Sequence, residues 1–572
     1  MVQKTYENPG QAPETGDPRS AWILKPSEPV HGRAGGALHG LRFAVKDNID
    51  VADLPTTAAC PAFARTATSH ASVVTRLLDA GATLIGKTNL DQFACGLNGT
   101  RSPYGAVPNA FNPQYVSGGS SAGSAYVVAS GQVDFALGTD TAGSGRVPAG
   151  LNNIVGLKPS RGLISAVGVV PAAQSVDTVS IFARTVPMAW RALAQAMGHD
   201  PLDPFSRRLG LRPAPFGAQF RFGIPQQLDF CDDELARSAF DSAVQRMQML
   251  GGIPVHFDYA PCAQAAALLY ESALLGERYA AVREFFDTHE SEVMEPVRSI
   301  IAKGRSYGAA DVFDAQVRLR ELGQQVEPLW DRFDVMLVPT APTHYTIAQM
   351  RSNPVDLNRK LGTYTNFVNL LDYAALSVPS SMRPDGLPFG ITLIAPCGSD
   401  WALADLGQRY HQATGLAMGA TGAPLTPAET LAPPPIDERE PRVTLAVVGA
   451  HLSGMPLNWQ LKERGARLLR GAETAPEYRL YALAGTVPPK PGLLRVPPGE
   501  GASIALEVWD MPTSHYGSFV ALIGAPLGIG TVRLSDGSLV QGFLCESEAA
   551  RNAQDITHYG GWRAYTQDRP GT

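Results

Sequence analysis

The sequence has few cysteines, and none of them has the spacing that cysteine-based sites require. Six cysteines are scattered along the 572 residues without a C-x-x-C pair: Cys60, Cys95, Cys231, Cys262, Cys397 and Cys545. Zinc sites and the disulfide frameworks of secreted domains need closely spaced or paired cysteines. We therefore expect reduced thiols of a cytoplasmic protein, and no metal site.

Long apolar runs and long basic runs are also missing. The longest apolar stretches, such as FVALIGAPLGIG (519–530), are broken by glycine and proline and fall short of the roughly 20 residues of a membrane helix. The N-terminal MVQKTYENPGQAPETGDP has no apolar signal core. A net charge of −6 without a basic run weighs against nucleic acid as a partner. With 44 % hydrophobic residues, the composition is typical of a soluble globular protein with a large core.

One stretch has no apolar periodicity. Residues 419–442 read GATGAPLTPAETLAPPPIDEREPR, which is typical of a linker. It separates residues 1–418 from residues 443–572. The first part alternates short apolar runs with helical stretches such as Cys231–Leu250, and this alternation predicts an α/β core. The second part has short β-like runs separated by glycine turns, which predict a smaller, mainly β domain.

Residues 81–88, GATLIGKT, match the G-x-x-x-x-G-K-T pattern of a phosphate-binding loop. Such a loop follows a strand and precedes a helix. Here residues 71–80 have apolar side chains at helical spacing, Gly81 suits the end of a helix, and ATLI is apolar like a buried strand. A strand cannot cradle a phosphate, so we expect a helix, a glycine stop and a buried strand. An ATP-dependent enzyme remains a disfavoured alternative.

Residues 117–150 contain two loops rich in glycine and serine around an apolar stretch. Ser144 has glycine on both sides, which would expose its hydroxyl and let backbone N–H groups approach a substrate. A nucleophilic serine needs a base. The eleven histidines leave a Ser-His-Asp triad conceivable, but none lies in a comparable motif and there is no G-x-S-x-G elbow. Lys46 ends the apolar run LRFAVK. A lysine at a strand end is more often solvated or snorkelling, but burial there would lower its pKa and make it a neutral base.

Five stretches together resemble the amidase signature family. They are FAVKDNID (43–50), IGKTNLDQFACG (85–96), SGGSSAGSA (117–125), GTDTAGSGRVPAG (138–150) and GLKPSRG (156–162). The resemblance covers most of residues 20–415, and it implies an α/β fold in which a mixed central sheet is covered by helices. It also implies a Ser–cis-Ser–Lys relay without metal or cofactor. Ser144 matches the nucleophile, Ser120 the bridging serine on a cis peptide, and Lys46 the base.

The same resemblance implies how the reaction's negative charge is held. The backbone N–H groups of four consecutive residues would form the oxyanion hole: Thr141, Ala142, Gly143 and Ser144. Asp140, Arg146 and Lys158 also match common family positions, and we expect these three charged residues to stabilise the loop rather than to take part in the chemistry.

The second part of the chain narrows the resemblance. An amidase core followed by VTLAVVGAHLSGMPLNWQL (443–461), EVWDMP (507–512) and GGWRAY (560–565) resembles the allophanate hydrolases, whose second domain is gamma-glutamyl cyclotransferase-like. Their substrate carries a carboxylate, which the planar fork of arginine suits. We interpret residues 267–282 as one helix with Tyr270 and Arg278 two turns apart, matching the pair that grips this carboxylate. His451 is our candidate titratable group of the second domain.

The implied activity is hydrolysis of allophanate to ammonia and carbon dioxide by a cytoplasmic homodimer that acts together with a urea carboxylase. Three alternatives remain. The chain could be another small-amide amidase with an appended binding domain, an ATP-dependent enzyme, or a scaffold without activity. The scaffold is disfavoured because all three relay residues are present. The sequence leaves open whether allophanate comes from urea or from triazine breakdown.

Overall fold

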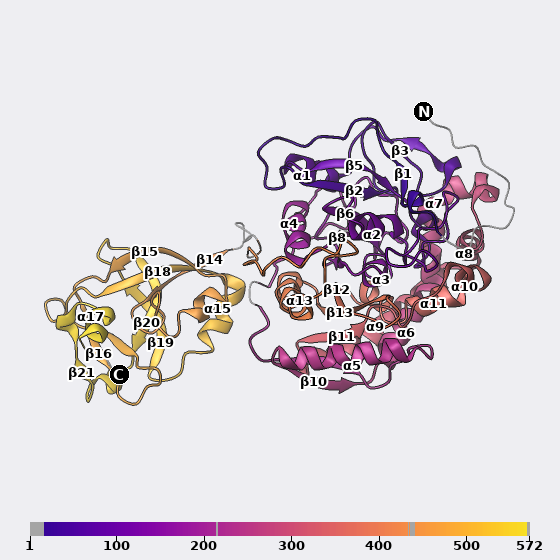
Figure 1. The fold of residues 1–572 in the computed structure, drawn as a ribbon. Coiled ribbons are helices and arrows are strands. Elements are labelled where there is room, and N and C mark those ends of the chain that lie inside the picture. Colours follow the sequence, from indigo (N-terminus) through magenta and orange to yellow (C-terminus); the bar gives the residue numbers. More distant parts are fainter. Residues whose placement is uncertain (1–15, 213–214, 433, 435–440, 569–572) are drawn as a thin grey trace. The chain divides into compact units, whose positions relative to one another are not determined.

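The chain separates into two compact units, Met1–Pro434 and Pro435–Thr572 (Figure 1). The computed structural model describes residues 16–212, 215–432, 434 and 441–568. Much of the stretch that we expected to be a linker lies against the first unit. The indole N–H of Trp190 donates to the carbonyl of Ala432 at 2.8 Å, and the side chain of Gln408 donates to the carbonyl of Glu429 at 2.7 Å.

An eleven-stranded mixed sheet forms the centre of the first unit, which confirms the predicted α/β class. Figure 1 shows the sheet running through the unit from β5 to β10. In spatial order its strands are β1 (Trp22–Leu24), β5 (Thr83–Thr88), β2 (Arg42–Lys46), β6 (Phe135–Asp140), β8 (Thr178–Ala183), β7 (Val155–Lys158), β12 (Tyr373–Met382), β13 (Pro388–Pro396), β11 (Val335–Pro339), β9 (Phe220–Pro225) and β10 (Gly252–Phe257). A separate short pair joins β3 (Pro55–Thr56) to β4 (Arg65–Thr66).

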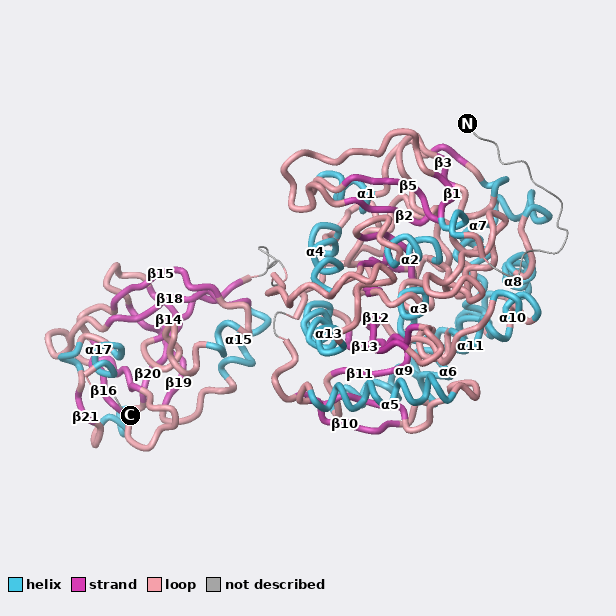
Figure 2. Tube along the Cα trace, viewed as in Figure 1, coloured by secondary structure: helices cyan, strands magenta, loops and turns pink. Residues whose placement is uncertain are grey.

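Helices cover this sheet (Figure 2). They are α1 (Ser72–Asp79), α2 (Ala122–Ala129), α3 (Val147–Leu151), α4 (Val186–Ala196), α5 (Glu234–Met249), α6 (Ala260–Glu271), α7 (Gly276–His289), α8 (Val297–Lys303), α9 (Ala309–Val326), α10 (Ile347–Ser352), α11 (Asp356–Leu361), α12 (Phe367–Leu370) and α13 (Asp400–Thr414). Among the helices of the described residues, none combines the length and the apolar character that a membrane crossing requires.

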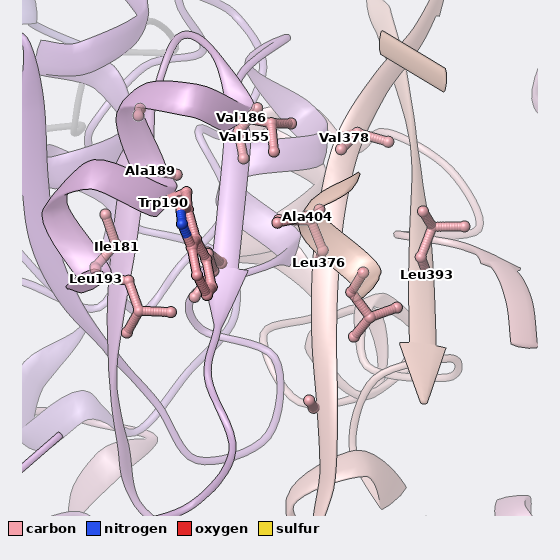
Figure 3. Close-up of a cluster of buried hydrophobic side chains, with 14 of the residues drawn as sticks. Val155, Ile181, Val186, Ala189, Trp190, Leu193, Leu376, Val378, Leu393 and Ala404 are labelled. Atoms are coloured by element: carbon pink, nitrogen blue, oxygen red, sulfur yellow. The ribbon is translucent and has the colours of Figure 1, made fainter. Parts of the chain in front are cut away.

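The largest core cluster lies between the sheet and the neighbouring helices α4 and α13. Figure 3 shows Trp190 of α4 in this cluster, together with side chains from β8 and β12. Trp190 is one of the largest fully buried side chains of the unit. Burying apolar surface contributes about 25 cal/mol per Å², so this layer holds the strands that carry the site residues in place.

The GATLIGKT stretch folds as a helix stop followed by a strand, as predicted. Helix α1 ends at Asp79, Gly81 has a φ of +96°, and the remaining residues form β5. The Lys87 side chain is completely buried, where its ammonium lies 2.9 Å from the carboxylate of Asp47 and donates to Thr56 Oγ1 at 2.7 Å. A lysine paired in this way inside a sheet is not available to a nucleotide phosphate, so this stretch is not a phosphate-binding loop.

The second unit is mainly β, as predicted (Figure 2). One sheet has the order β15 (Arg467–Glu473), β18 (Ala505–Pro512), β14 (Arg442–Val447), β20 (Leu539–Cys545) and β19 (Leu527–Arg533), and a second has the order β17 (Pro491–Arg495), β16 (Tyr478–Ala482) and β21 (Gln554–Asp555). Its helices are short: α14 (Trp459–Lys462), α15 (Thr513–Val520), α16 (Ser547–Ala550) and α17 (Trp562–Gln567). This unit has its own core, which includes Trp509 and Trp562.

Candidate active site

Lys46 is the last residue of β2, a strand that pairs with β5 on one side and β6 on the other. The position puts its side chain out of contact with solvent. There the ammonium donates two hydrogen bonds of 2.7 Å, one to Ser120 Oγ and one to Thr139 Oγ1. The structure therefore joins two of the three residues of the predicted relay.

Burial lowers the pKa of Lys46 from its ordinary value of 10.5 to about 7. Three carboxylates oppose this effect, those of Asp91, Asp177 and Asp140, whereas the positive charge of Arg278 adds to it. A lysine with a pKa near 7 is partly neutral at physiological pH and can accept a proton. The predicted neutral base thus has a physical cause, which is mainly desolvation.

Ser120 lies in the first glycine-serine loop, just before α2, and the Gly119–Ser120 peptide bond is cis. Its hydroxyl is fully buried. Neighbouring groups anchor this loop, because the N–H of Asp91 donates to the carbonyl of Ser120 at 3.0 Å. A side chain could not replace the hydrogen of Gly119, since a Cβ there would lie 2.2 Å from the carboxylate of Asp91. The glycine is therefore required for the loop to approach Asp91 so closely.

Ser144 lies in the second loop, between β6 and α3. Its Oγ is buried and is 3.4 Å from the carbonyl oxygen of Gly96, to which it donates. Within the described residues, Ser144 Oγ has no hydrogen bond with Ser120. The structure thus brings Lys46 and Ser120 into contact, whereas the step from Ser120 to Ser144 stays a prediction.

The backbone of the second loop is shaped by Asp140. Its carboxylate accepts hydrogen bonds from the N–H groups of Gly143 at 2.8 Å and Gly145 at 3.0 Å, and it pairs with the buried guanidinium of Arg146 at 2.9 Å. Although burial raises the pKa of Asp140, Arg146 brings it below its ordinary value. The Asp140–Arg146 pair therefore remains charged and holds the loop from inside.

This arrangement limits which N–H groups can hold an oxyanion. The N–H of Gly143 is already engaged by Asp140. The N–H groups of Thr141, Ala142 and Ser144 have no partner among the described residues, so these three are the available donors of the predicted hole. Lys158, the third charged residue expected to stabilise the loop, donates to the carbonyls of Pro159 and Tyr373 at 2.9 and 2.8 Å.

Tyr270 and Arg278 come from two helices rather than from the single helix that we predicted. Tyr270 is near the end of α6 and Arg278 near the start of α7. Between them, Ser272 has an extended backbone and its hydroxyl bonds to the peptide groups of its neighbours, donating to the carbonyl of Leu268 and accepting from the N–H of Leu274. Serine side chains can compete in this way with the hydrogen bonds of a helix. This is why the predicted helix is interrupted at Ser272.

The two side chains nevertheless meet. Arg278 Nη2 donates to the Tyr270 hydroxyl at 3.4 Å, and the guanidinium carbon lies 5.2 Å from the centre of the tyrosine ring. Arg278 is only 4 % exposed, and its Nε and Nη1 have no hydrogen-bond partner in the described part of the chain. Buried donors without partners are costly. Two such donors on a buried cation indicate a binding site for an anion.

Two residues near the base were not predicted. Thr139 holds the Lys46 ammonium, and Asp177 contributes negative charge beside it. Thr139 lies inside one of the quoted stretches, near the end of β6, the strand that pairs with the one ending at Lys46. Asp177 lies outside all five stretches, and no local pattern identifies it.

In the second unit His451 lines a cavity of about 210 Å³, together with polar Gln460 and Lys490 and with apolar side chains that include Phe543. The His451 ring stacks on Phe543 with 5.0 Å between ring centres, and its Nε2 lies 2.8 Å from Gln460 Oε1. Burial lowers the pKa of His451. A cavity with a few polar groups on an apolar wall is the usual form of a small-molecule site.

Both units match known families. Residues 23–403 match the amidase family, and residues 443–567 match the allophanate hydrolase C-terminal domain. The structure of Kluyveromyces lactis allophanate hydrolase is 42 % identical to this chain in sequence. The two structures align with a TM-score of 0.85, over 98 % of this chain and 94 % of that chain. The K. lactis urea amidolyase structure gives the same identity and TM-score over 35 % of its own chain.

The urea amidolyase of Saccharomyces cerevisiae is 45 % identical over 540 residues, which are 92 % of this chain and 29 % of that protein. The chain thus spans less than a third of the length of this curated relative. The order of the two domains is the one that the sequence predicted. This chain belongs to the amidase family and carries the C-terminal domain of the allophanate hydrolases.

Proposed function

We propose that this chain is an amidohydrolase that hydrolyses allophanate, a urea that carries a carboxylate. The observation that supports the substrate is the buried Arg278, whose two unpartnered donors lie next to Tyr270 and whose charge acts on Lys46. An amidase for neutral amides has no need of such a cation. The 42 % identity with K. lactis allophanate hydrolase, over nearly its whole length, supports the same substrate.

In the proposed mechanism, Ser144 Oγ attacks the terminal amide carbonyl of allophanate. Its proton passes to Ser120, while Ser120 gives its own proton to neutral Lys46. The N–H groups of Thr141, Ala142 and Ser144 stabilise the oxyanion. The relay then returns a proton to the leaving nitrogen, ammonia departs, and water cleaves the acyl-enzyme in the same way. The products are ammonia and a carbamate that carries a second carboxylate.

The second unit would take that product further. We assign this step to the cavity around His451, in which Lys490 can balance the charge of a carboxylate and Gln460 holds the imidazole. The carboxylated carbamate takes up two protons and breaks its two nitrogen–carboxyl bonds, which gives a second ammonia and two molecules of carbon dioxide. Allophanate itself would come from a urea carboxylase, as the K. lactis and S. cerevisiae urea amidolyases suggest. We further propose a homodimer that works in the cytoplasm.

A direct assay tests this proposal. Ammonia release from allophanate is compared with release from neutral amides of similar size, with the Ser144→Ala variant as the blank. We expect two ammonia molecules per allophanate and a kcat/KM at least a hundredfold above that for any neutral amide. Equal or better use of a neutral amide would instead support the alternative of a general amidase with an appended binding domain.

A further inference from the structure

Asp177 is a carboxylate beside the site that has no role in the relay. It lies at the end of a segment, residues 172–177, that leads into β8. The carboxylate accepts hydrogen bonds from Thr141 Oγ1 at 2.5 Å and from the N–H groups of Ala172 at 2.7 Å and Ala173 at 3.2 Å. Thr141 is the first residue of the loop that carries Ser144. Asp177 therefore binds this loop to the segment 172–177.

The same segment is also bound to helix α7. The carboxylate of Glu277 accepts hydrogen bonds from Ser175, one from its N–H at 2.6 Å and one from its hydroxyl at 2.7 Å. Glu277 directly precedes Arg278 in the sequence. The segment is thus attached at Ser175 to the helix that carries the anion-binding arginine, and at Asp177 to the loop that carries the nucleophile.

A third attachment limits how far the segment can move. The side-chain amide of Asn369 donates to the carbonyl of Val176 at 3.0 Å and to the carbonyl of Asp140 at 2.7 Å. Asn369 also accepts a hydrogen bond of 2.9 Å from Arg146. The segment and the loop therefore share one buried support. The backbone from Ser175 to Asp177, with hydrogen bonds at both ends, connects the helix of Arg278 with Thr141.

The orientation of Thr141 matters for the reaction. Its N–H is one of the three available donors of the oxyanion hole, and its side chain is held by Asp177. An oxyanion donor must point at the position that the charged oxygen takes in the transition state. A threonine whose hydroxyl is fixed has little freedom to turn its own peptide plane.

We propose that Asp177 is a positioning residue that orients Thr141 in the oxyanion hole and ties it, through Ser175 and Glu277, to the helix of Arg278. The first half of this proposal holds for any amide substrate, and the second half rests on the proposed function. Losing the Thr141 end lowers kcat, because the oxyanion forms only in the transition state. Losing the Ser175 end raises KM for carboxylated substrates, because it loosens the cation that binds them.

The test uses the full chain and a pair of substitutions that differ in one hydroxyl. Thr141→Val removes the hydroxyl at nearly constant volume, and Thr141→Ser keeps it. We expect Thr141→Val to lower kcat by 10- to 100-fold on allophanate and on a neutral amide alike, with KM changed less than threefold. Thr141→Ser should recover most of that loss. Equal kcat for the two variants, at equal melting temperature, would overturn the proposal, as would an unchanged kcat in Thr141→Val.

Two further variants test the contacts of Ser175 and Asp177. They remain informative even if the Thr141 variants do not fold. Ser175→Ala should raise KM for allophanate three- to tenfold without changing kcat/KM for a neutral amide. Burial raises the pKa of Asp177 to about 6, so its carboxylate is charged above that pH and Asp177→Asn removes this charge. The pKa of Lys46, which also faces Asp91, Asp140 and Arg278, should then fall, and the part of the rising limb of kcat/KM above pH 6 should move to lower pH. A limb that stays in place, or a Ser175→Ala effect that is equal for both substrates, would leave Asp177 with a merely structural role. If allophanate is not a substrate at all, the Thr141 pair still reports through the neutral amide.

Discussion

The ammonium nitrogen of Lys46 lies 2.7 Å from the hydroxyl oxygen of Ser120, at a place closed to solvent. The two residues are 74 positions apart in the chain, and only the packing of the first glycine-serine loop against the end of β2 brings them together. This pair supplies the first step of the proposed relay. It also makes the relay sensitive to pH, since one of its two partners is a lysine with a pKa near 7.

Replacement of the nucleophile should abolish turnover. Ser144→Ala and Ser120→Ala are each expected to lower kcat by several orders of magnitude, because members of a catalytic unit cannot act alone. Steady-state ammonia release measures the loss, and circular dichroism melting checks that the fold is kept. A Ser144→Ala enzyme with a tenth of the original rate would show that another residue is the nucleophile.

The rate should rise with pH through about 7. Lys46 must be neutral to accept a proton, and its pKa in the folded protein is about 7. We therefore expect kcat/KM for a neutral amide to increase tenfold per pH unit below pH 6 and to level off above pH 8. In the Arg278→Met variant the midpoint should move to higher pH, because the positive charge of Arg278 lowers the pKa of Lys46. A flat profile from pH 5 to 9 would exclude Lys46 as the base.

The buried lysine should also cost stability. Its folded pKa of about 7 lies below its ordinary 10.5, so unfolding takes up a proton between these values and the cost is largest at pH 7 and below. Lys46→Met should therefore raise the free energy of unfolding at pH 7 by up to roughly 4 kcal/mol, and by less as the pH approaches 10.5. Denaturant titrations at pH 7, 8.5 and 10 measure this. A variant that is less stable at pH 7 would contradict the burial argument.

Arg278→Met should separate carboxylated from neutral substrates. Removing the cation leaves the substrate carboxylate unpaired, at a cost of roughly 2–5 kcal/mol, which is about 30-fold to several thousand-fold in kcat/KM for allophanate. A small neutral amide should lose less than threefold when each variant is assayed at its own optimal pH. Arg318→Met, which removes an arginine from a surface ion pair, is the matched control. Equal losses on both substrates would mean that Arg278 only supports the fold.

A chain that ends at Pro434 should keep the first reaction and lose the second. Residues 16–432 contain every residue of the relay, and the cavity around His451 lies wholly in the second unit. Time-resolved counting should show the first ammonia at the full rate and the second ammonia delayed, because the carboxylated carbamate then decays unaided. His451→Ala in the full chain should show a milder delay. If both ammonia molecules still appear together in the two variants, the second unit has no part in the chemistry.

Much of the fold could be predicted from local patterns in the sequence. The spacing of Val73, Val74 and Leu77 predicted α1, the glycine at position 81 predicted its end, and the apolar ATLI predicted β5. The candidates for the relay followed from the glycine-serine loops, from the lysine that ends an apolar run and from the resemblance that these stretches carry. Such features depend on neighbours in the chain, and a sequence displays them directly. The single helix over 267–282 failed because one serine, Ser272, bonds locally to the backbone instead.

By itself the sequence determined the α/β class of the first domain, the mainly β character of the second, and the amidase family with its candidate residues. Only the tertiary structure decided what those residues can do. It buried Lys46 away from water and brought Tyr270 and Arg278 together from separate helices. It also bound the N–H of Gly143 to the carboxylate of Asp140. It also placed Asp177 against Thr141, 36 residues away. These properties depend on burial and on contacts between residues that are far apart in the chain. Patterns among neighbouring residues do not show which remote segments lie side by side.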